Sequence, residues 1–352
     1  MDDFTFKYVC DMGKAGHDKG KGGKYLILPP GYEGKVPEGY HTFTSPTYNN
    51  WLAIRAFPTA EDPQAGVKGV KAHLKIYALS EANNPPPVKF LPWSGKPINT
   101  IHGNDFSFFE EINEVIQEEP SSALDPETLG LLAHIGIQKG KPFKPDARMK
   151  KILVEAAAVG NATTRAISFA TRDKSMFYYP DRQWKITFNG GYKFTKKNGE
   201  RHLDGRAFFH YVATGNTPAM EAKLVGAGSQ YLFTERDSKG HYLDGGKNYK
   251  ITVPPEAPVK DFWSFMVYSG QHRSMLQTDQ QFPGIDSNKQ DLKKNADGSV
   301  TLYFGPKAPS GKEKNWVQTL PNKSFNLLFR MYSPLEPWFD KTWKIGDFEL
   351  VE

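Results

Sequence analysis

Short β-rich runs, interrupted by Pro, Gly and Asn pairs, fill the first hundred residues of the chain. Such interruptions are typical of strands joined by turns. Between these runs, Asp62-Pro63 has the form of a helix N-cap followed by proline at the first helical position. The expected elements are strands over 24–28, 39–44, 51–57 and 74–79, and a helix from Asp62 to about Ala72.

The spacing of apolar residues changes after the proline-rich break at 83–87. Phe106, Phe109 and Ile112 recur at intervals of three residues, which predicts one face of a helix. After Gly226, aromatic and β-branched runs between glycine turns return, as expected for strands. The expected helices lie near 106–116, 125–136, 146–169 and 204–214, with a fifth after Thr217-Pro218, and the expected strands at 231–234, 249–253, 262–268, 300–304, 325–332 and 348–351.

Two distant segments share a local pattern. In each, a strand stops at a Pro-Pro pair, turns, and returns as an aromatic strand, once at Pro29-Pro30 and once at Pro254-Pro255. Proline cannot donate to a sheet ladder, so each pair marks a strand end or an edge. The pattern predicts a duplicated β unit, although hairpins that converge on the same pattern would give the same signal.

The composition supports a β-rich fold with more than one core. The 352-residue chain holds 24 Phe, 16 Tyr and 7 Trp, which fit pleated and half-buried surfaces, and its 32 Gly and 26 Pro suit many turns. This length exceeds what one hydrophobic core usually supports. We therefore predict a mainly β protein of two β-sandwich (jelly-roll-like) units, at 1–100 and 226–352, with a helical insertion at 101–225.

The charge of the chain bears on whether it binds nucleic acid. The net charge of +6 favours loose association with anionic surfaces, but the dense basic run from Lys14 to Lys24 is interleaved with glycine and is predicted to be a solvated loop. No specific nucleic-acid partner is therefore expected.

The single cysteine, Cys10, excludes an internal disulfide. No apolar run is long enough for a membrane span, and Met1 begins no secretory signal, so a complete chain would be cytoplasmic.

Several long strings resemble known families. The runs 22–32 (GGKYLILPPGY) and 45–48 (SPTY) resemble the domain of unknown function 1254. The runs 273–280 (RSMLQTDQ), 303–309 (YFGPKAP) and 335–340 (LEPWFD), with Asn315-Trp316, resemble its usual partner, the domain of unknown function 1214. The resemblance covers nearly the whole chain. It implies a pair of jelly-roll-like β domains with helices between them, often in exported proteins, and it carries no catalytic residues over.

The chain departs from this family near its start. Members usually have a longer N-terminal part that supplies further strands and often an export signal, so we expect either a truncated chain or a shortened member with an incomplete first domain. A half-built sheet leaves an unpaired edge, which favours association between copies. A homo-oligomer is therefore expected, and the identity of a small-molecule or glycan ligand stays open.

The strong enzyme signatures do not occur in the sequence. HExxH and a complete Walker loop are absent, and the nearest approach to GxSxG, at Gly226 to Gln230, is out of register. The nine histidines are spread along the chain without metal-ligand spacing. Neither a cofactor nor a metal ion is predicted.

The densest polar cluster follows the predicted strand at 262–268. One interpretation makes His272 and Asp279 a general base and its orienting group, with Arg273 binding an anion. In the other, which we favour, Arg273 and Asp279 pair across a loop and satisfy a buried turn. The cluster comprises Gln271, His272, Arg273, Gln277, Asp279 and Gln280.

Two further groups of residues can be explained by a structural role as well as by a functional one. The acidic residues Asp105, Glu110 and Glu111, near His102, are expected to be helix caps. Tryptophans can form a glycan-stacking platform but are more often core or rim residues of a sandwich. The residues concerned are Trp316, Trp338 and Trp343.

The leading functional hypothesis is a non-catalytic module that binds or assembles with a partner. The alternative is a hydrolase in the cleft between the β units, with His272, Arg273 and Asp279 as catalytic candidates. Geometry discriminates the two, because His272 within hydrogen-bond reach of Asp279 in an open pocket would favour the hydrolase. The candidate ligand-binding residues are Gln277, Trp316 and Trp338.

Overall fold

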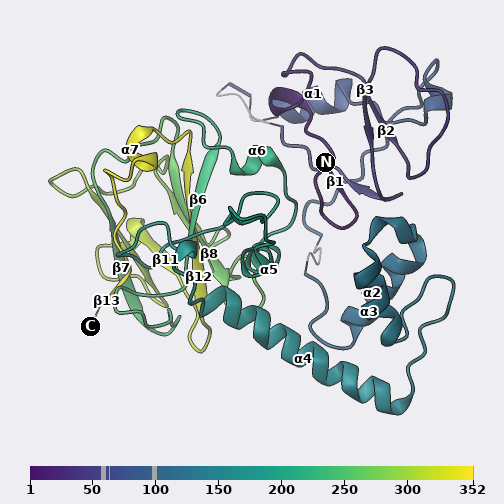
Figure 1. Cartoon of the computed structure of the whole chain (residues 1–352). Coiled ribbons are helices and arrows are strands. Elements are labelled where there is room, and N and C mark those ends of the chain that lie inside the picture. Colours follow the sequence, from purple (N-terminus) through teal and green to yellow (C-terminus); the bar gives the residue numbers. More distant parts are fainter. Residues whose placement is uncertain (57–60, 63, 97–100, 352) are drawn as a thin grey trace. The chain divides into compact units, whose positions relative to one another are not determined.

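The computed structural model describes residues 1–56, 61–62, 64–96 and 101–351. The chain divides into two compact units, Met1–Lys151 (unit 1) and Ile152–Glu352 (unit 2) (Figure 1). The boundary falls inside the long helix α4 (Ala147–Phe169). The segment 101–225, which the sequence predicts as one helical insertion, is therefore shared between the two units.

Unit 1 has only short strands in its described residues. β1 (Asp2–Asp3) pairs antiparallel with β4 (Asn50–Trp51), and β2 (Tyr25–Leu28) pairs parallel with β3 (His41–Thr44). The helices are α1 (Ala65–His73), α2 (Ser107–Glu118) and α3 (Pro126–His134). The start of α3 follows the sequence closely, because the Asp125 side chain accepts the backbone N–H of Thr128 and Pro126 occupies the first turn.

The predicted strands nearest α1 differ from the structure. The expected strand over 74–79 is not formed, since the backbone leaves α1 without pairing and enters a 3₁₀ turn at Leu79–Glu81. The expected strand over 51–57 is reduced to β4, and residue 57 lies outside the described residues. β4 has its ladder partner β1 only over Asn50–Trp51, and no described strand pairs with the other described residues of either segment.

Unit 2 contains two larger sheets. One has four strands in the order β11-β10-β7-β13, and the other has five in the order β5-β6-β12-β8-β9. All neighbours are antiparallel except β10 and β11. The strands are β5 (Lys185–Ile186), β6 (Ser229–Thr234), β7 (Asn248–Val253), β8 (Trp263–Ser269), β9 (Gly284–Asp286), β10 (Val300–Gly305), β11 (Trp316–Gln318), β12 (Phe325–Tyr332) and β13 (Glu349–Val351).

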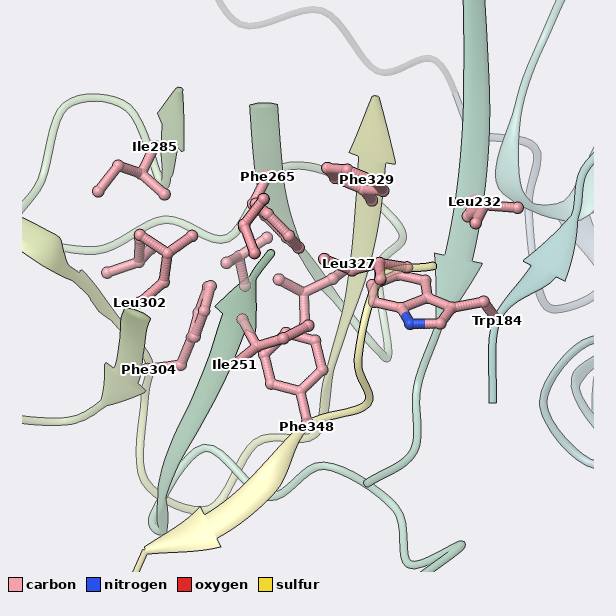
Figure 2. Packing of buried hydrophobic residues seen from close by; sticks show 14 of the residues in the cluster. Trp184, Leu232, Ile251, Phe265, Ile285, Leu302, Phe304, Leu327, Phe329 and Phe348 are labelled. Atoms are coloured by element: carbon pink, nitrogen blue, oxygen red, sulfur yellow. The ribbon is translucent and has the colours of Figure 1, made fainter. Parts of the chain in front are cut away.

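The two sheets of unit 2 share one hydrophobic cluster (Figure 2). Along β12, Phe325, Leu327 and Phe329 alternate with more exposed residues and are all at most 2% exposed. Ile251 on β7 and Phe304 on β10 bring the four-stranded sheet into the same cluster. The period-two alternation of the sequence thus places one face of each strand in a common core.

Helices cover part of the outer face of the five-stranded sheet. A second cluster of Met176, Phe208 and Phe233 is joined by Phe169 from the end of α4 and by Val212. Phe208 and Val212 belong to α5 (Leu203–Val212). The remaining helices of unit 2 are α6 (Pro218–Glu221) and α7 (Glu336–Phe339). No described helix is long and apolar enough to cross a bilayer.

The two Pro-Pro segments differ in strand pairing. β2, which ends before Pro29-Pro30, pairs directly with the returning strand β3. β7, which ends before Pro254-Pro255, pairs with β10 and β13, and the returning strand β8 lies in the other sheet. The local likeness therefore does not extend to the sheet connections.

Candidate functional site

The predicted polar cluster begins in a tight turn at the end of β8. Ser269 organises this turn, because its hydroxyl accepts the N–H of Gln271 and of His272, at 3.3 and 3.1 Å. Its carbonyl accepts the N–H of Arg273 at 2.9 Å. Arg273 itself has a φ of 63°, in the left-handed region that non-glycine residues rarely adopt. The turn therefore fixes the direction in which the Arg273 side chain leaves the backbone.

The members of the cluster are not brought together. His272 and Gln277 are exposed. The Asp279 carboxylate accepts from Gln318 Nε2 at 2.9 Å, and its N–H donates to Gln318 Oε1 at 2.9 Å. Within the described part of the chain, no ion pair joins Asp279 to His272 or to Arg273. Asp279 therefore ties its loop to β11, and neither sequence interpretation of this carboxylate matches the geometry.

Arg273 is enclosed. The residue is only 9% exposed, and its guanidinium carbon lies 4.0 Å from the ring centroid of Tyr211 on α5. Both terminal nitrogens, Nη1 and Nη2, are buried without a hydrogen-bond partner among the described residues. Tyr211 was not expected from the sequence, because it lies on a separate helix and no local pattern links it to Arg273.

A second arginine contacts the same tyrosine. Arg165 on α4 donates from Nη1 to the Tyr211 hydroxyl at 3.3 Å and to the Gly270 carbonyl at 3.0 Å. Its guanidinium carbon also lies 5.5 Å from the ring centroid of Phe169. We refer to Arg165, Tyr211 and Arg273 as the arginine pair site. All three residues belong to unit 2, and the site joins α4, α5 and the turn after β8.

Three neighbouring strands carry a second group, which we call the tyrosine–arginine patch. It consists of Tyr231 on β6, Tyr268 on β8, and Arg330 and Tyr332 on β12. Arg330 Nη2 donates to the Tyr268 hydroxyl at 2.7 Å, and its guanidinium carbon lies 6.0 Å from the Tyr231 ring centroid. Burial raises the pKa of the Tyr268 hydroxyl, although the nearby Arg330 opposes this shift. The four side chains are half-buried.

Two buried charges of unit 2 form an ion pair. Lys185 Nζ lies 2.5 Å from Glu235 Oε2 and donates to the Ser168 carbonyl at 2.6 Å. The same nitrogen lies 5.3 and 5.1 Å from the ring centroids of Phe208 and Phe233. Desolvation lowers the pKa of Lys185 and raises that of Glu235. The pair ties the end of α4 to the five-stranded sheet and is inaccessible to a ligand.

His202, Asp173 and Ser175 lie close together but do not form a nucleophile site. His202 Nδ1 accepts the N–H of Gly205 at 3.1 Å and so caps α5, while Nε2 lies 3.3 Å from Asp173 Oδ2. The Ser175 hydroxyl donates to Asp173 at 2.7 Å. An activated serine would instead hydrogen-bond to the imidazole. These contacts are those of helix and turn capping.

Trp338 and Trp343 both pack on the core of unit 2, with ring centroids 5.9 and 6.4 Å from that of Phe329. Trp338 is 1% exposed and stacks on Tyr178 at 5.3 Å, so a sugar could not reach it. Trp316 is half-buried, and its indole N–H donates to the Gly305 carbonyl at 3.0 Å. Near α2, Asp105 accepts the N–H of Ser107 at 2.9 Å and Glu111 accepts that of Gly103 at 3.1 Å, but the N-cap residue Phe106 makes no side-chain capping bond.

Unit 1 is organised around buried carboxylates. Glu119, 4% exposed, accepts the backbone N–H of Tyr48 at 2.6 Å and of Asn49 at 3.0 Å. Asp18 accepts the Tyr25 hydroxyl at 2.6 Å and the N–H of Gly13 at 2.8 Å. The hydrogen bond from Tyr25 holds the pKa of Asp18 below its usual value. The Gly/Lys loop therefore folds around Asp18, while its lysines are exposed to solvent as predicted.

Comparison with known proteins agrees with the two sets of strings in the sequence. Residues 1–78 match the model of the "Protein of unknown function (DUF1254)", and residues 228–336 match that of the "Protein of unknown function (DUF1214)". No curated protein matches the chain.

Two solved structures resemble this chain weakly, with low sequence identity and low TM-scores. The crystal structure of the VPA0106 protein from Vibrio parahaemolyticus is 17% identical with a TM-score of 0.43, over 94% of this chain and 76% of that one. A putative uncharacterized protein from Burkholderia cenocepacia is 22% identical with a TM-score of 0.25, over 38% and 33% of the two chains. The family assignment rests on the two sequence models, and the chain carries a DUF1254 segment followed by a DUF1214 domain, as the sequence resemblance predicted.

Proposed function

We propose that the chain is a non-catalytic binding module and that unit 2 carries its ligand-binding surface. In this proposal the two sheets of unit 2 form a jelly-roll-like β-sandwich that serves as a rigid support. The observation that carries the proposal is the tyrosine–arginine patch, in which Tyr231, Tyr268, Tyr332 and Arg330 lie half-buried on adjacent strands.

The chemistry of the patch suits recognition of a polar ligand. Tyrosine and arginine dominate binding hot spots, because each offers a large contact area together with hydrogen-bonding groups. Tyr231 is paired directly with Arg330 in the β6–β12 ladder, so backbone hydrogen bonds hold both side chains in place. The Phe262 ring stacks on Tyr332 at 4.1 Å and restricts it further. Residues that are ordered before binding lose less conformational entropy when a ligand arrives.

The geometry of the predicted catalytic residues supports binding without bond cleavage. A general base needs an orienting partner and must reach the proton that it removes. His272 is exposed, while Asp279 is engaged by Gln318. We therefore prefer the binding module to the hydrolase.

The test uses the full chain and a fixed panel of probes: inorganic phosphate, succinate and cellotetraose. Binding is measured by calorimetry for the wild type and for Arg330→Gln, with the exposed Arg206→Gln on α5 as the matched control. We expect at least one probe to bind the wild type and the control equally and to bind Arg330→Gln about tenfold more weakly. Equal binding to Arg330→Gln, or no binding of any probe, contradicts the proposal.

A second assay tests whether the chain hydrolyses esters, phosphates or glycosides. Chromogenic ester, phosphate and glycoside substrates are incubated with the wild type and with His272→Ala. We expect no turnover that depends on His272. Hydrolysis by the wild type that is lost in His272→Ala would establish the hydrolase instead.

A further inference from the structure

We infer that the exposed run 89–96 (KFLPWSGK) is a shallow anchor for a membrane surface of anionic phospholipids. We call it the apolar–lysine run. It belongs to unit 1, whereas the tyrosine–arginine patch belongs to unit 2. The inference does not depend on the function proposed for that patch.

The run exposes three large apolar side chains within four positions. Phe90 is 39% exposed, Leu91 62% and Trp93 54%, and every residue from 89 to 96 is exposed. Single exposed apolar residues are ordinary, but several at one place are typical of an interaction site. Trp and Phe favour the boundary between lipid and water, where a ring enters the apolar layer while a polar group such as the indole N–H stays near the headgroups. The side chains of this run therefore suit a bilayer interface.

The charge of the run complements anionic headgroups. Lys89 and Lys96 flank the apolar residues, and the sequence has no acidic residue between Glu81 and Asp105. The Lys96 ammonium lies 5.4 Å from the ring centroid of Trp93, which places a positive charge directly beside the apolar surface. Lysine stems are long enough for the ammonium groups to reach phosphates while neighbouring rings lie deeper. The net charge of +6 adds attraction of the same sign over longer distances.

The backbone of the run is compatible with shallow insertion only. Irregular backbone is not tolerated in the hydrocarbon layer, because its polar groups would lose water without gaining partners. The described residues 85–96 contain neither helix nor strand. Residues 85–87 and Pro92 are prolines and have no N–H, and the N–H of Lys96 donates to the Trp93 carbonyl at 3.0 Å. Side chains can thus enter the interface while the backbone stays at headgroup depth.

A lipid surface suits the apolar–lysine run better than a protein partner does. A stable protein interface uses roughly 20–30 residues a side, whereas this run has eight and offers neither a strand edge nor a helix face. Peripheral membrane binding needs only a few buried apolar side chains together with attraction to anionic lipids. Two cations without a neighbouring carboxylate match a surface that carries many negative charges.

The experiment is co-sedimentation of the full chain with vesicles of equal parts phosphatidylcholine and phosphatidylglycerol, and with vesicles of phosphatidylcholine alone. We expect the wild type to bind the anionic vesicles more tightly and to be released by added sodium chloride. Leu91→Ser/Trp93→Ser should weaken binding about tenfold through lost apolar burial. Lys89→Gln/Lys96→Gln should also weaken it about tenfold, and only on the anionic vesicles.

Matched controls separate the run from other exposed apolar residues. Leu131 and Phe282 are 64% and 67% exposed, and Leu131→Ser/Phe282→Ser should bind vesicles like the wild type. The patch variant Arg330→Gln should also bind normally. Because the substituted side chains of the run are exposed, its variants should keep the melting temperature of the wild type, so that their weaker binding does not come from unfolding.

Tryptophan fluorescence gives a readout that does not depend on affinity. Binding to anionic vesicles should shift the emission of the wild type to shorter wavelength, because the indole of Trp93 leaves water. Trp93→Phe should still bind, within about threefold of the wild type, but should lose most of this shift. A full shift in Trp93→Phe would show that Trp93 stays in water and would contradict the anchor.

Three results overturn the inference. The first is a wild type that does not co-sediment with anionic vesicles. The second is equal binding by Leu91→Ser/Trp93→Ser, which would show that the chain associates through its net charge alone. The third is self-association without vesicles that is lost in the same double variant, which would assign the run to a contact between copies of the chain.

Discussion

Units 1 and 2 are stabilised by different kinds of interaction. In unit 2, side chains from two sheets form a continuous core that includes Phe265, Phe304 and Phe329. In unit 1, the described apolar residues that are buried are Cys10, Leu28, Ile116, Ala123 and Ile137, and they form no comparable cluster. Buried polar groups have the larger part there. Ser45 and Thr47 are fully buried, and Asp3 accepts three hydrogen bonds from Thr5 and Lys7.

The difference shows how an irregular segment can be ordered without a large core. Non-directional apolar burial tolerates small shifts, whereas a carboxylate that accepts two or three N–H groups specifies one backbone conformation. Unit 2 should therefore be destabilised most by loss of side-chain volume in its core, and unit 1 by loss of hydrogen-bond acceptors. Four substitutions test this contrast, in order of decreasing expected effect.

Phe329→Ala should destabilise unit 2 most. Phe329 is fully buried and stacks on Phe265 at 4.7 Å, so truncation leaves a cavity between the sheets. We expect a loss of about 4 kcal/mol in the free energy of unfolding, measured by denaturant titration. The control Phe282→Ala, at a residue 67% exposed, should change it by less than about 0.5 kcal/mol. Equal effects of the two substitutions would contradict a tightly packed core.

Lys185→Met should cost about 3 kcal/mol, because it removes the closer of the two cations of the buried Glu235 and leaves only Arg236, at 3.5 Å. The double variant Lys185→Met/Glu235→Leu should recover most of this loss, since the uncompensated charge is then also removed. Thermal and denaturant unfolding of the three proteins measure the difference. A double variant as unstable as the single one would mean that the hydrogen bond to the Ser168 carbonyl, and not charge compensation, is the main contribution.

Glu119→Gln should destabilise unit 1 by about 2 kcal/mol, because an amide cannot replace both carboxylate oxygens as acceptors for Tyr48 and Asn49. Faster hydrogen exchange at these two amides measures the effect. The adjacent and exposed Glu118 offers a matched control, and Glu118→Gln should leave exchange nearly unchanged. Unaltered exchange in Glu119→Gln would show that the turn holds without the carboxylate.

The smallest effect concerns Asp18 and appears as a pH dependence. Its folded-state pKa lies below the usual value because of the Tyr25 hydroxyl. Its contribution to stability is therefore present above the ordinary Asp pKa of about 4 and is lost as the pH falls toward the folded value. Asp18→Asn should flatten the acid side of the unit 1 stability profile, while the exposed Glu33→Gln should not. Identical profiles for Asp18→Asn and the wild type would rule out this role.

Much of the strand and helix content of this chain could be predicted from its sequence. The expected strand over 325–332 coincides with β12, and the expected helix over 146–169 with α4 apart from one residue. Both are long and strongly periodic. β5, β9 and β11 were missed, because two or three residues contain no period and their pairing depends on neighbours far along the chain.

The candidate sites were only partly predictable. Arg273 stands out in a polar cluster of the sequence, but its burial against Tyr211 arises from packing between α5 and the turn after β8. Arg165 lies in a long amphipathic helix and has no local signal that separates it from other surface arginines. A signal was available for Glu235, because it follows the apolar pair Leu232-Phe233 of β6 by two residues and is thus close to the core.

Cys10 is a natural labelling probe for the local opening of unit 1. It is the only cysteine in the sequence and has no solvent exposure in the folded chain. A thiol-specific reagent can therefore label the protein only when the segment around Cys10 opens. The rate at which the labelled protein gains mass therefore reports the opening of unit 1 alone, and not changes in the aromatic core of unit 2.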